Sequence, residues 1–501
     1  MTKSAMKTRL RDSLAAIRKT VQEGGTDWVA DNYYLIHRYE KLPQRGGCFR
    51  YPSAAELMAA YLAENGGTCD EESLCRFLAE HGREKPLSYG EISAVPAALA
   101  YCAITRIGDI CKGEKNAALL PEAVGVLREL SEIRISPLFS AAWQAEGVLE
   151  AEEQDYSLFS PETKAAYRKT LSKRAKKHRR SEKEEALQLV KAAKRDAVAV
   201  GNLLFPQKVS PLPRVVWFSL FFLFTALGGW LFYWWFGWLF LPLLLPLGAG
   251  VAPLCDRLTA PLCKRPAPLR LQLPHIPDRG RTVVAVATLF SKKEDYVERL
   301  ERFYYLNREE NLSFCLLADL PAAKEARTAE DEELIRHAKA SIDELNKRHG
   351  ERFFLLYRDR AKQDDGSYGG KERKRGAVGM LIRRLCGLEV GYLHGKAPTG
   401  AGYLLTLDGD TELSPGILRE LIGVALHPAN RSFGVIQPGV HTELYSSSRT
   451  YFTRLISGNA GVSFYERACF DRNMSLFGEG IFCGKGLIDL QKFRPARRGG
   501  S

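Results

Sequence analysis

YLLTLDGDT, residues Tyr403–Thr411, is an apolar run that ends at two carboxylates, Asp408 and Asp410. A short apolar run of this kind is typical of a strand buried in a parallel sheet. In open α/β sheets, ligands bind just beyond the carboxyl ends of such strands. The pattern therefore predicts a binding site at the end of this strand. The alternative is an exposed turn with two solvated Asp side chains.

Two aspartates separated by one residue can hold a divalent cation, because Mg²⁺ and Mn²⁺ prefer hard oxygen ligands. A cation held in this way can in turn bind the phosphates of a nucleotide diphosphate. We therefore expect Asp408 and Asp410 to be ligands of Mg²⁺ or Mn²⁺, and Asp408 to contact the substrate as well.

The sequence around this strand alternates between strands and helices from about residue 280. Apolar runs at 281–290, 311–320 and 352–360 are each followed by a segment with helical spacing of its apolar residues. This order predicts an open, largely parallel sheet of the nucleotide-binding type. No G-x-G-x-x-G is present, so the sequence does not indicate a dinucleotide site.

A basic element, KERKRG (371–376), precedes the Asp408 strand by one helix. Guanidinium groups pair with phosphates in a bidentate way, and a helix N-terminus attracts anions. We expect this element to contact a diphosphate, and the alternative is a solvated basic cap. The four side chains concerned are Lys371, Arg373, Lys374 and Arg375.

A glycine-rich stretch, FDRNMSLFGEGIFCGKG (470–486), holds two further candidate carboxylates, Asp471 and Glu479. Carboxylates in such a loop can bind sugar hydroxyls or act as a general base. Gly478 and Gly480 allow the backbone to approach a ligand closely. A glycine-rich surface loop with incidental charges is the alternative.

The interval from Val215 to Cys255 contains 41 residues and no charge. One bilayer crossing needs about 20 residues, so this interval is long enough for two short helices or one long, tilted helix. Basic residues flank both ends, and Gly228, Gly229 and Gly237 offer places to turn. These features favour a transmembrane hairpin with both ends cytoplasmic over a single span or a buried core helix.

The residues before this segment have mostly helical spacing of apolar positions, and Pro96 is expected to interrupt one of those helices. Basic residues gather in 169–195, where they either lie against anionic lipid or form a solvated helical face. The predicted organisation is a helical N-terminal domain (1–205), a transmembrane region with linkers (206–270) and an α/β domain (271–501).

The composition narrows the possible partners. The net charge is +13, yet the basic residues are not interleaved with a nucleic-acid-reading motif, so no nucleic acid partner is expected. The eleven cysteines show no zinc spacing and indicate a reducing compartment.

Several strings together resemble the N-terminal part of the bacterial cyclic β-1,2-glucan synthases, which are membrane glycosyltransferases. The resemblance runs from about residue 27 to about residue 490. The strings are DNYYLIHRY (31–39), LSYGEISAVPAAL (87–99), VATLFSKKED (286–295), FYYLNREENLSFCLLADLPAA (303–323), the KERKRG element, YLLTLDGDTEL (403–413), GVIQPGV (434–440) and FYERACFDRNMSLFGEGIFCGKG (464–486).

The resemblance implies a metal-dependent inverting glucosyltransferase domain of the GT-A type beside membrane helices, with catalysis on the cytoplasmic side of the inner membrane. It implies UDP-glucose as donor, a growing glucan chain as acceptor and a lipid bilayer as surroundings. By this likeness Thr288 and Asp319 line the nucleotide pocket, and Glu479 lies at the sugar or acceptor end. Tyr465 is the candidate for a residue that accepts the first glucose.

Family members continue beyond the glycine-rich loop with a segment that holds the expected base, whereas this sequence ends at Ser501. The resemblance therefore implies a truncated, C-terminally incomplete glucosyltransferase domain. Two alternatives stay open at this point. One is a membrane fragment that binds UDP-sugar without transfer, or only scaffolds. The other is a different processive β-glycosyltransferase, similar to cellulose or hyaluronan synthases.

Overall fold

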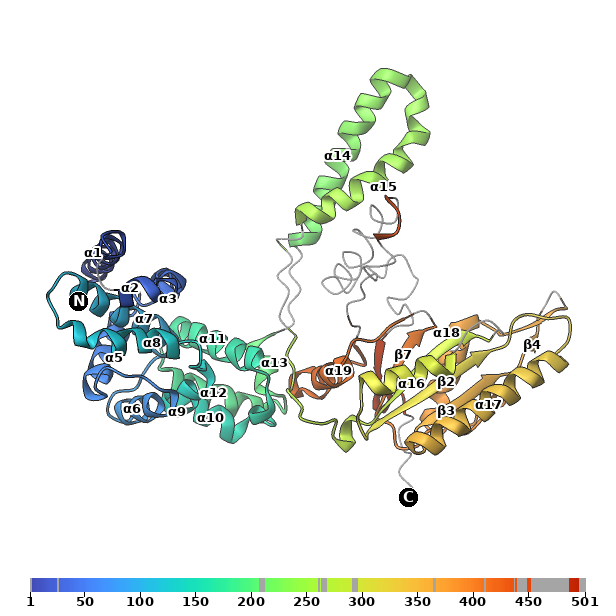
Figure 1. Cartoon of the computed structure of the whole chain (residues 1–501). Coiled ribbons are helices and arrows are strands. Elements are labelled where there is room, and N and C mark those ends of the chain that lie inside the picture. The colour runs from blue at the N-terminus through green and yellow to red at the C-terminus, as the bar shows by residue number, and fades with distance from the viewer. Residues whose placement is uncertain are drawn as a thin grey trace. The chain divides into compact units, whose positions relative to one another are not determined.

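The computed structural model describes most of the chain (Figure 1). The chain divides into two compact units: residues 1–157 with 161–204, and residues 158–160 with 205–501. The described residues are 2–24, 27–206, 212–259, 262, 268–290, 296–363, 366–409, 411–436, 438, 448–451 and 486–494.

The first unit is helical. Its central element is α7, which begins with a capping box at Ser88 and Glu91 and contacts α1, α5 and α8. The helices are α1 (Lys3–Gln22), α2 (Asp27–Asp31), α3 (Tyr33–Tyr39), α4 (Leu42–Arg45), α5 (Pro52–Glu64), α6 (Glu71–Glu84), α7 (Tyr89–Cys111), α8 (Leu120–Glu129), α9 (Ile135–Ala142), α10 (Gln144–Glu152), α11 (Pro161–His178), α12 (Glu182–Arg195) and α13 (Val200–Leu204), with a 3₁₀ turn η1 (Ala117–Leu119) before α8.

The expected interruption at Pro96 is wrong, because α7 continues through this residue. Proline in a helix interior removes one backbone hydrogen bond and is costly. Here the helix is almost wholly buried among its neighbours, with sixteen buried residues, and this packing outweighs the local preference.

The apolar segment forms two helices, α14 (Leu212–Phe236) and α15 (Phe240–Thr259), joined by the 3₁₀ turn η3 (Gly237–Leu239). They lie side by side as a hairpin (Figure 1). A Cβ atom on Gly228 would come within 2.8 Å of Leu247, so the missing side chain allows the two helices to approach closely. Gly237 has φ +53° at the turn, where the sequence predicted a change of direction.

Two described segments are long and apolar enough to cross a membrane by length and composition: α7 and Val215–Thr259. Most of α7 is buried inside the first unit, whereas almost none of the hairpin is buried. The tryptophans near the hairpin turn, Trp234, Trp235 and Trp238, are each more than 70% exposed. An apolar surface of this extent needs a covering environment.

The second unit contains a seven-stranded sheet of order β6-β3-β2-β1-β7-β9-β8. β3, β2, β1 and β7 are parallel to one another, and the other three strands are antiparallel additions at the two edges. The strands of this sheet are β1 (Thr282–Leu289), β2 (Leu312–Asp319), β3 (Phe353–Arg358), β6 (Leu393–His394), β7 (Tyr403–Asp408), β8 (Val435–Ile436) and β9 (Gly486–Asp489); β4 (Ala361–Lys362) and β5 (Tyr368–Gly369) form a separate pair.

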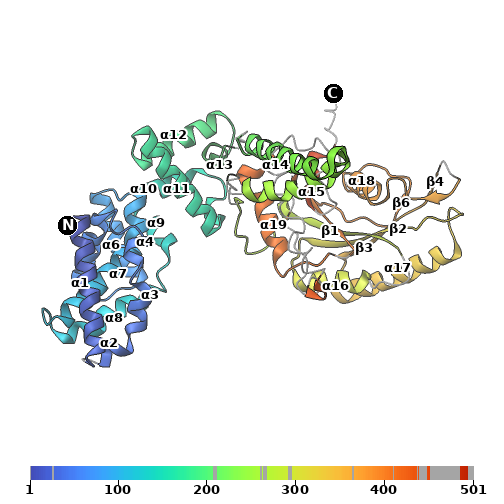
Figure 2. The same cartoon turned by 90° about the horizontal axis from the view of Figure 1, so that it is seen from above.

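Helices cover both faces of this sheet. α18 packs Ala377, Val378 and Leu381 against one face, and Figure 2 shows α17 on the opposite side of the strands. These helices are α16 (Tyr296–Leu306), α17 (Ala329–His349) and α18 (Arg373–Leu385), followed after β7 by α19 (Ile417–Leu426). The prediction of an α/β fold with a largely parallel sheet is thus confirmed.

Candidate functional site

The carboxyl ends of four parallel strands bring together residues that lie far apart in the sequence. β2 and β3 lie on one side of β1, and β7 lies on the other side. The order of strands therefore reverses between β1 and β7, where open α/β sheets bind their ligands. The residues at this edge are Thr288 and Leu289 (β1), Asp319 (β2), Arg358 (β3) and Asp408 (β7).

Asp408 lies at this switch point, directly opposite Ala287 of β1. The next residue, Gly409, passes so close to β1 that a Cβ atom there would lie 3.1 Å from the Thr288 hydroxyl. Thr411 donates its backbone N–H to the Asp408 carbonyl over 3.1 Å, so the chain turns immediately after the strand. The Asp408 side chain keeps 31% of its surface exposed and is accessible to a ligand.

Lys374 makes an ion pair with the Asp408 carboxylate, between Nζ and Oδ1. The structure therefore joins two features that the sequence presented separately, namely the basic element and the carboxylate after β7. Lys374 is 32% exposed, so the pair is open to solvent on one side. A cation beside a carboxylate at the carboxyl edge of a sheet provides charges of both signs for a metal–diphosphate ligand.

A buried ion pair lies two strands away and was not predicted. Arg358 donates to both carboxylate oxygens of Asp319, with distances of 2.9 Å from Nε and 2.6 Å from Nη2. The Arg358 side chain is only 1% exposed. The sequence did contain a signal for the role of Arg358, because RFFLLYR is an apolar strand that ends in a charge at the same edge as Asp408.

This buried pair also holds the basic element in place. The Arg358 guanidinium donates to the carbonyl oxygens of Lys371 (2.8 Å) and Arg373 (2.9 Å). Glu372 and Arg373 have positive φ values of 57° and 43°, so the chain makes a tight left-handed turn before α18. The guanidinium therefore fixes the turn from which the Lys374 side chain reaches Asp408.

Two glycines make this arrangement possible. A Cβ atom on Gly370 would lie 2.2 Å from Arg358 Nη2, and one on Gly376 would lie 2.2 Å from the Lys371 carbonyl oxygen. Neither distance is tolerable for a real side chain, so the backbone must be bare at both positions.

We expect Gly376→Ala to destabilise the protein by about 1–3 kcal/mol, the usual cost of overpacking, and to displace Lys374. Gly379→Ala is the matched control, because Gly379 lies on the same helix with nothing within 4 Å of its Cβ position. That substitution should be neutral or stabilising by about 0.5–1 kcal/mol. Thermal denaturation of both variants measures the difference, and equal melting temperatures would contradict the packing described.

A second buried pair fixes the chain after β2. Arg360 donates to both oxygens of Asp331, over 2.6 and 2.9 Å. Burial alone would raise the pKa of Asp331, but hydrogen bonds from Arg360 and Thr328 outweigh it and hold this pKa below its usual value. The pair therefore stabilises the fold above the pKa of an unfolded Asp, and this contribution is lost as the pH falls through the lowered value.

The other predicted site residues divide into two groups. Thr288 is half-buried at the end of β1, and the side chains of Lys371, Arg373 and Arg375 are exposed around the start of α18. Their roles stay predictions. Six residues lie outside the described part of the chain: Asp410, Tyr465, Asp471, Gly478, Glu479 and Gly480.

The side chains around Asp408 can be compared with the ligands that a divalent cation needs. Among the described residues, which do not include Asp410, no three His, Cys, Asp or Glu side chains form a metal-binding group. Asp408 nevertheless supplies a hard, partly exposed oxygen ligand that already attracts a cationic group. Three residues further on, the buried hydroxyl of Thr411 has no hydrogen-bond partner within the described chain. These oxygens suit Mg²⁺ or Mn²⁺.

No protein-family model matches the chain. The chain is similar to a cyclic beta-(1,2)-glucan synthase, NdvB of Rhizobium meliloti, with 27% identity over 449 aligned residues. The alignment covers 76% of this chain and only 16% of the length of NdvB. The resemblance noted in the sequence is confirmed: the chain is a relative of that enzyme.

Proposed function

We propose that this chain is a membrane-anchored glucosyltransferase of the β-glucan synthase kind, with its donor site at the β1–β7 switch point. The observation that carries the proposal is the meeting of Lys374 and Asp408 at that point. The similarity to a cyclic beta-(1,2)-glucan synthase supports a sugar nucleotide as donor and a β-1,2-linked glucan as product. UDP-glucose is the donor that we propose.

The proposed roles follow from the chemistry of each group. Asp408, together with Asp410, would hold Mg²⁺ or Mn²⁺, which neutralises charge on the leaving diphosphate when bound. Lys374 would contact the diphosphate directly, with the other cations of the basic element around it. Thr288 and Asp319 would line the nucleotide pocket.

The acceptor end of the proposed site falls on residues outside the described chain. Asp471 or Glu479 would take the proton from the attacking sugar hydroxyl, and Gly478 and Gly480 would let the backbone approach the sugar. Tyr465 would be the first acceptor. The single substitutions Asp471→Asn, Glu479→Gln and Tyr465→Phe distinguish these roles.

The Lys374–Asp408 pair suggests how donor binding proceeds. In the described state each group neutralises the other. With a metal–diphosphate ligand in the site, Asp408 would hold the cation, and Lys374 would pair with the phosphate oxygens instead of Asp408. Both charges then remain paired throughout, which avoids the cost of leaving either one unpaired.

Calorimetric titration of the full chain in detergent with UDP tests the proposal. We expect UDP to bind at least about 30-fold more tightly with Mn²⁺ than without, a change worth about 2 kcal/mol. Equal UDP affinity with and without metal would contradict the proposed donor site. If UDP binds in a metal-dependent way but no glucose is released from UDP-glucose, the chain binds the donor without transferring its sugar.

We further propose that the α14–α15 hairpin crosses the membrane and returns, so that both units lie on the cytoplasmic side. Epitope tags inserted at Gly113 in the first unit and Gly387 in the second, both exposed turn residues, test this topology. Protease should reach both tags from the same side of sealed vesicles. Tags on opposite sides would reduce the hairpin to a single crossing and remove one unit from the cytoplasm.

A further inference from the structure

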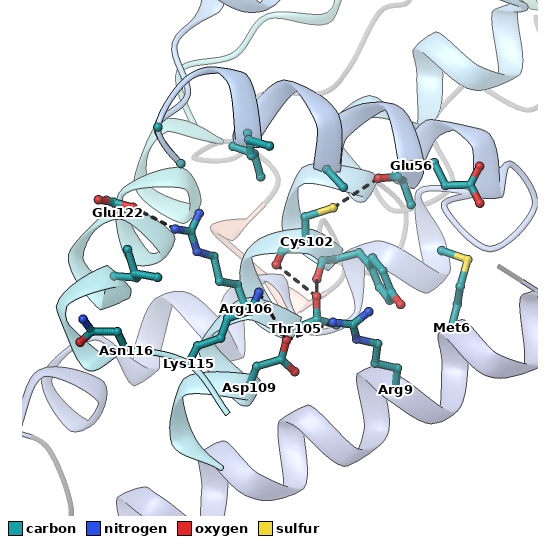
Figure 3. A pocket seen from close by; sticks show the side chains of 18 of the residues that line it. Met6, Arg9, Glu56, Cys102, Thr105, Arg106, Asp109, Lys115, Asn116 and Glu122 are labelled. Carbon is teal, nitrogen blue, oxygen red and sulfur yellow. Dashed lines mark hydrogen bonds and ion pairs between the residues drawn. The ribbon is translucent and has the colours of Figure 1, made fainter. Parts of the chain in front are cut away.

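The helical unit contains a cavity of about 680 Å³ that the proposed glucosyltransferase chemistry does not use (Figure 3). It is bounded by α1, α5 and α7 and by the segment that leads through η1 into α8. Cavities that bind small molecules have volumes of about 300–1,000 Å³. The size of this cavity is therefore that of a ligand site.

Small side chains create the space. Ala55, Ala59 and Ala63 are spaced four residues apart on α5, and all three line the cavity. Met6 and Leu62 complete an apolar wall. Larger residues on this stripe of α5 would fill the cavity, and their absence leaves an apolar surface for the carbon skeleton of a ligand.

One residue of the cavity lining, Tyr101, carries a buried hydroxyl. Tyr101 is 4% exposed, and its hydroxyl has no hydrogen-bond partner among the described residues. Burial raises the pKa of Tyr101 to about 12, so the phenol keeps its proton at neutral pH and can donate. Because a buried, unpaired polar group is costly, this hydroxyl needs a partner that the described residues do not supply.

The cationic side chains around the cavity are already engaged with carboxylates. Three cationic side chains line it (Arg9, Arg106 and Lys115), and so do three acidic ones (Glu56, Asp109 and Glu122). Arg9 and Lys115 pair with Asp109 at 3.0 and 3.8 Å, and Arg106 pairs with Glu122 at 3.0 Å. Figure 3 shows these pairs at the edge of the cavity.

This arrangement discriminates between classes of ligand. A phosphate would lie among three carboxylates and would have to compete with Asp109 and Glu122 for the cations that they already hold. An acyl chain would leave the Tyr101 hydroxyl unpaired and would cover the ion pairs with methylene groups. A neutral molecule with many hydroxyls can accept from the cations and Tyr101, donate to the carboxylates and place its C–H groups on the alanine wall.

We propose that the cavity between α1, α5 and α7 is a binding site for a neutral saccharide, separate from the donor site in the sheet. A chain that builds glucan would then recognise sugar in its helical unit as well. The proposal rests on the lining residues of this unit alone, so it stands or falls independently of the donor site.

Binding of two probes, glucose and the β-1,2-linked disaccharide sophorose, is measured by ligand-observed NMR on the full chain in lipid nanodiscs. We expect saturable binding of at least one probe. Tyr101→Phe should weaken it about three- to tenfold, the value of one hydrogen bond. The same variant should not lower the melting temperature, because it removes an unpaired buried hydroxyl.

Ala59→Phe should abolish binding by filling the cavity, whereas Ala60→Phe should leave it unchanged. Both alanines are exposed on α5, but only Ala59 lines the cavity. Asp408→Asn should also leave this binding unchanged, which separates it from the donor site. The proposal is overturned if neither probe binds, if Ala59→Phe binds as the parent does, or if phosphate or laurate binds instead with the same Ala59 dependence.

Discussion

Asp408→Asn should weaken UDP binding in the presence of Mn²⁺ by about 30-fold and remove the dependence on metal. Loss of one partner from a hydrogen-bonded charge pair costs about 2–5 kcal/mol when the pair is buried. Since Asp408 is 31% exposed, the lower figure applies, and about 2 kcal/mol corresponds to about 30-fold. Calorimetry with UDP at saturating Mn²⁺ measures the change.

The metal-free titration gives the opposite expectation for the same variant. Without Mn²⁺, Asp408→Asn should bind UDP at least as well as the parent, because the uncharged side chain no longer neutralises Lys374. Asp278→Asn is the matched control, an 88% exposed aspartate before β1 at the opposite end of the strand, and it should change neither titration. A uniform loss with and without metal would show that Asp408 acts on the fold rather than on the ligand.

Arg358→Met should destabilise the second unit by about 3–5 kcal/mol, the usual cost of leaving a buried charge without its partner. The substitution leaves Asp319 buried and removes the donor to the Lys371 and Arg373 carbonyl oxygens. The basic element should lose its fixed turn, so UDP binding should weaken as well. Thermal denaturation in detergent at a fixed scan rate, together with UDP titration, measures both effects.

Arg348→Met is the control for this prediction, because Arg348 is about half exposed and pairs with Glu301 on the surface. It should cost less than about 1 kcal/mol. The double variant Arg358→Met/Asp319→Leu should recover part of the lost stability, since apolar replacement of both partners is often tolerated. If the double variant is no more stable than Arg358→Met, Arg358 stabilises the protein by holding the turn at residues 371–373 and not by neutralising Asp319.

The parallel part of the sheet could be predicted because its signals are local. Each of the four strands is a continuous apolar run, and each expected range overlaps the observed strand, as 311–320 does with β2 (Leu312–Asp319). The edges could not be predicted in this way. β6 and β8 have two residues each, and β9 begins at Gly486, at the end of a stretch expected to be a loop. Such strands exist only through pairing with distant partners.

The sequence predicted which types of residue form the candidate site, but not which of these residues contact one another. The strand-end position of Asp408 and the cations of the basic element are visible in the sequence, yet the Lys374–Asp408 pair depends on a turn that Arg358 fixes. Arg358 itself lies at the end of an apolar run that was interpreted only as a strand of the sheet, with no role for its charged end. The prediction at Pro96 was wrong for a different reason. A local signal was read correctly as a helix breaker, but tertiary packing around α7 outweighs it.

Photolabelling with 5-azido-UDP-glucose, followed by peptide mapping, tests most directly whether the donor binds at the β1–β7 switch point. The labelled peptides should come from the carboxyl ends of β1, β2 and β7 or from the basic element at 371–376, and Mn²⁺ should strengthen the labelling. Unlabelled UDP should compete. Labelling confined to the helical unit, or spread over the chain without competition by UDP, would contradict a donor site built on Asp408 and Lys374.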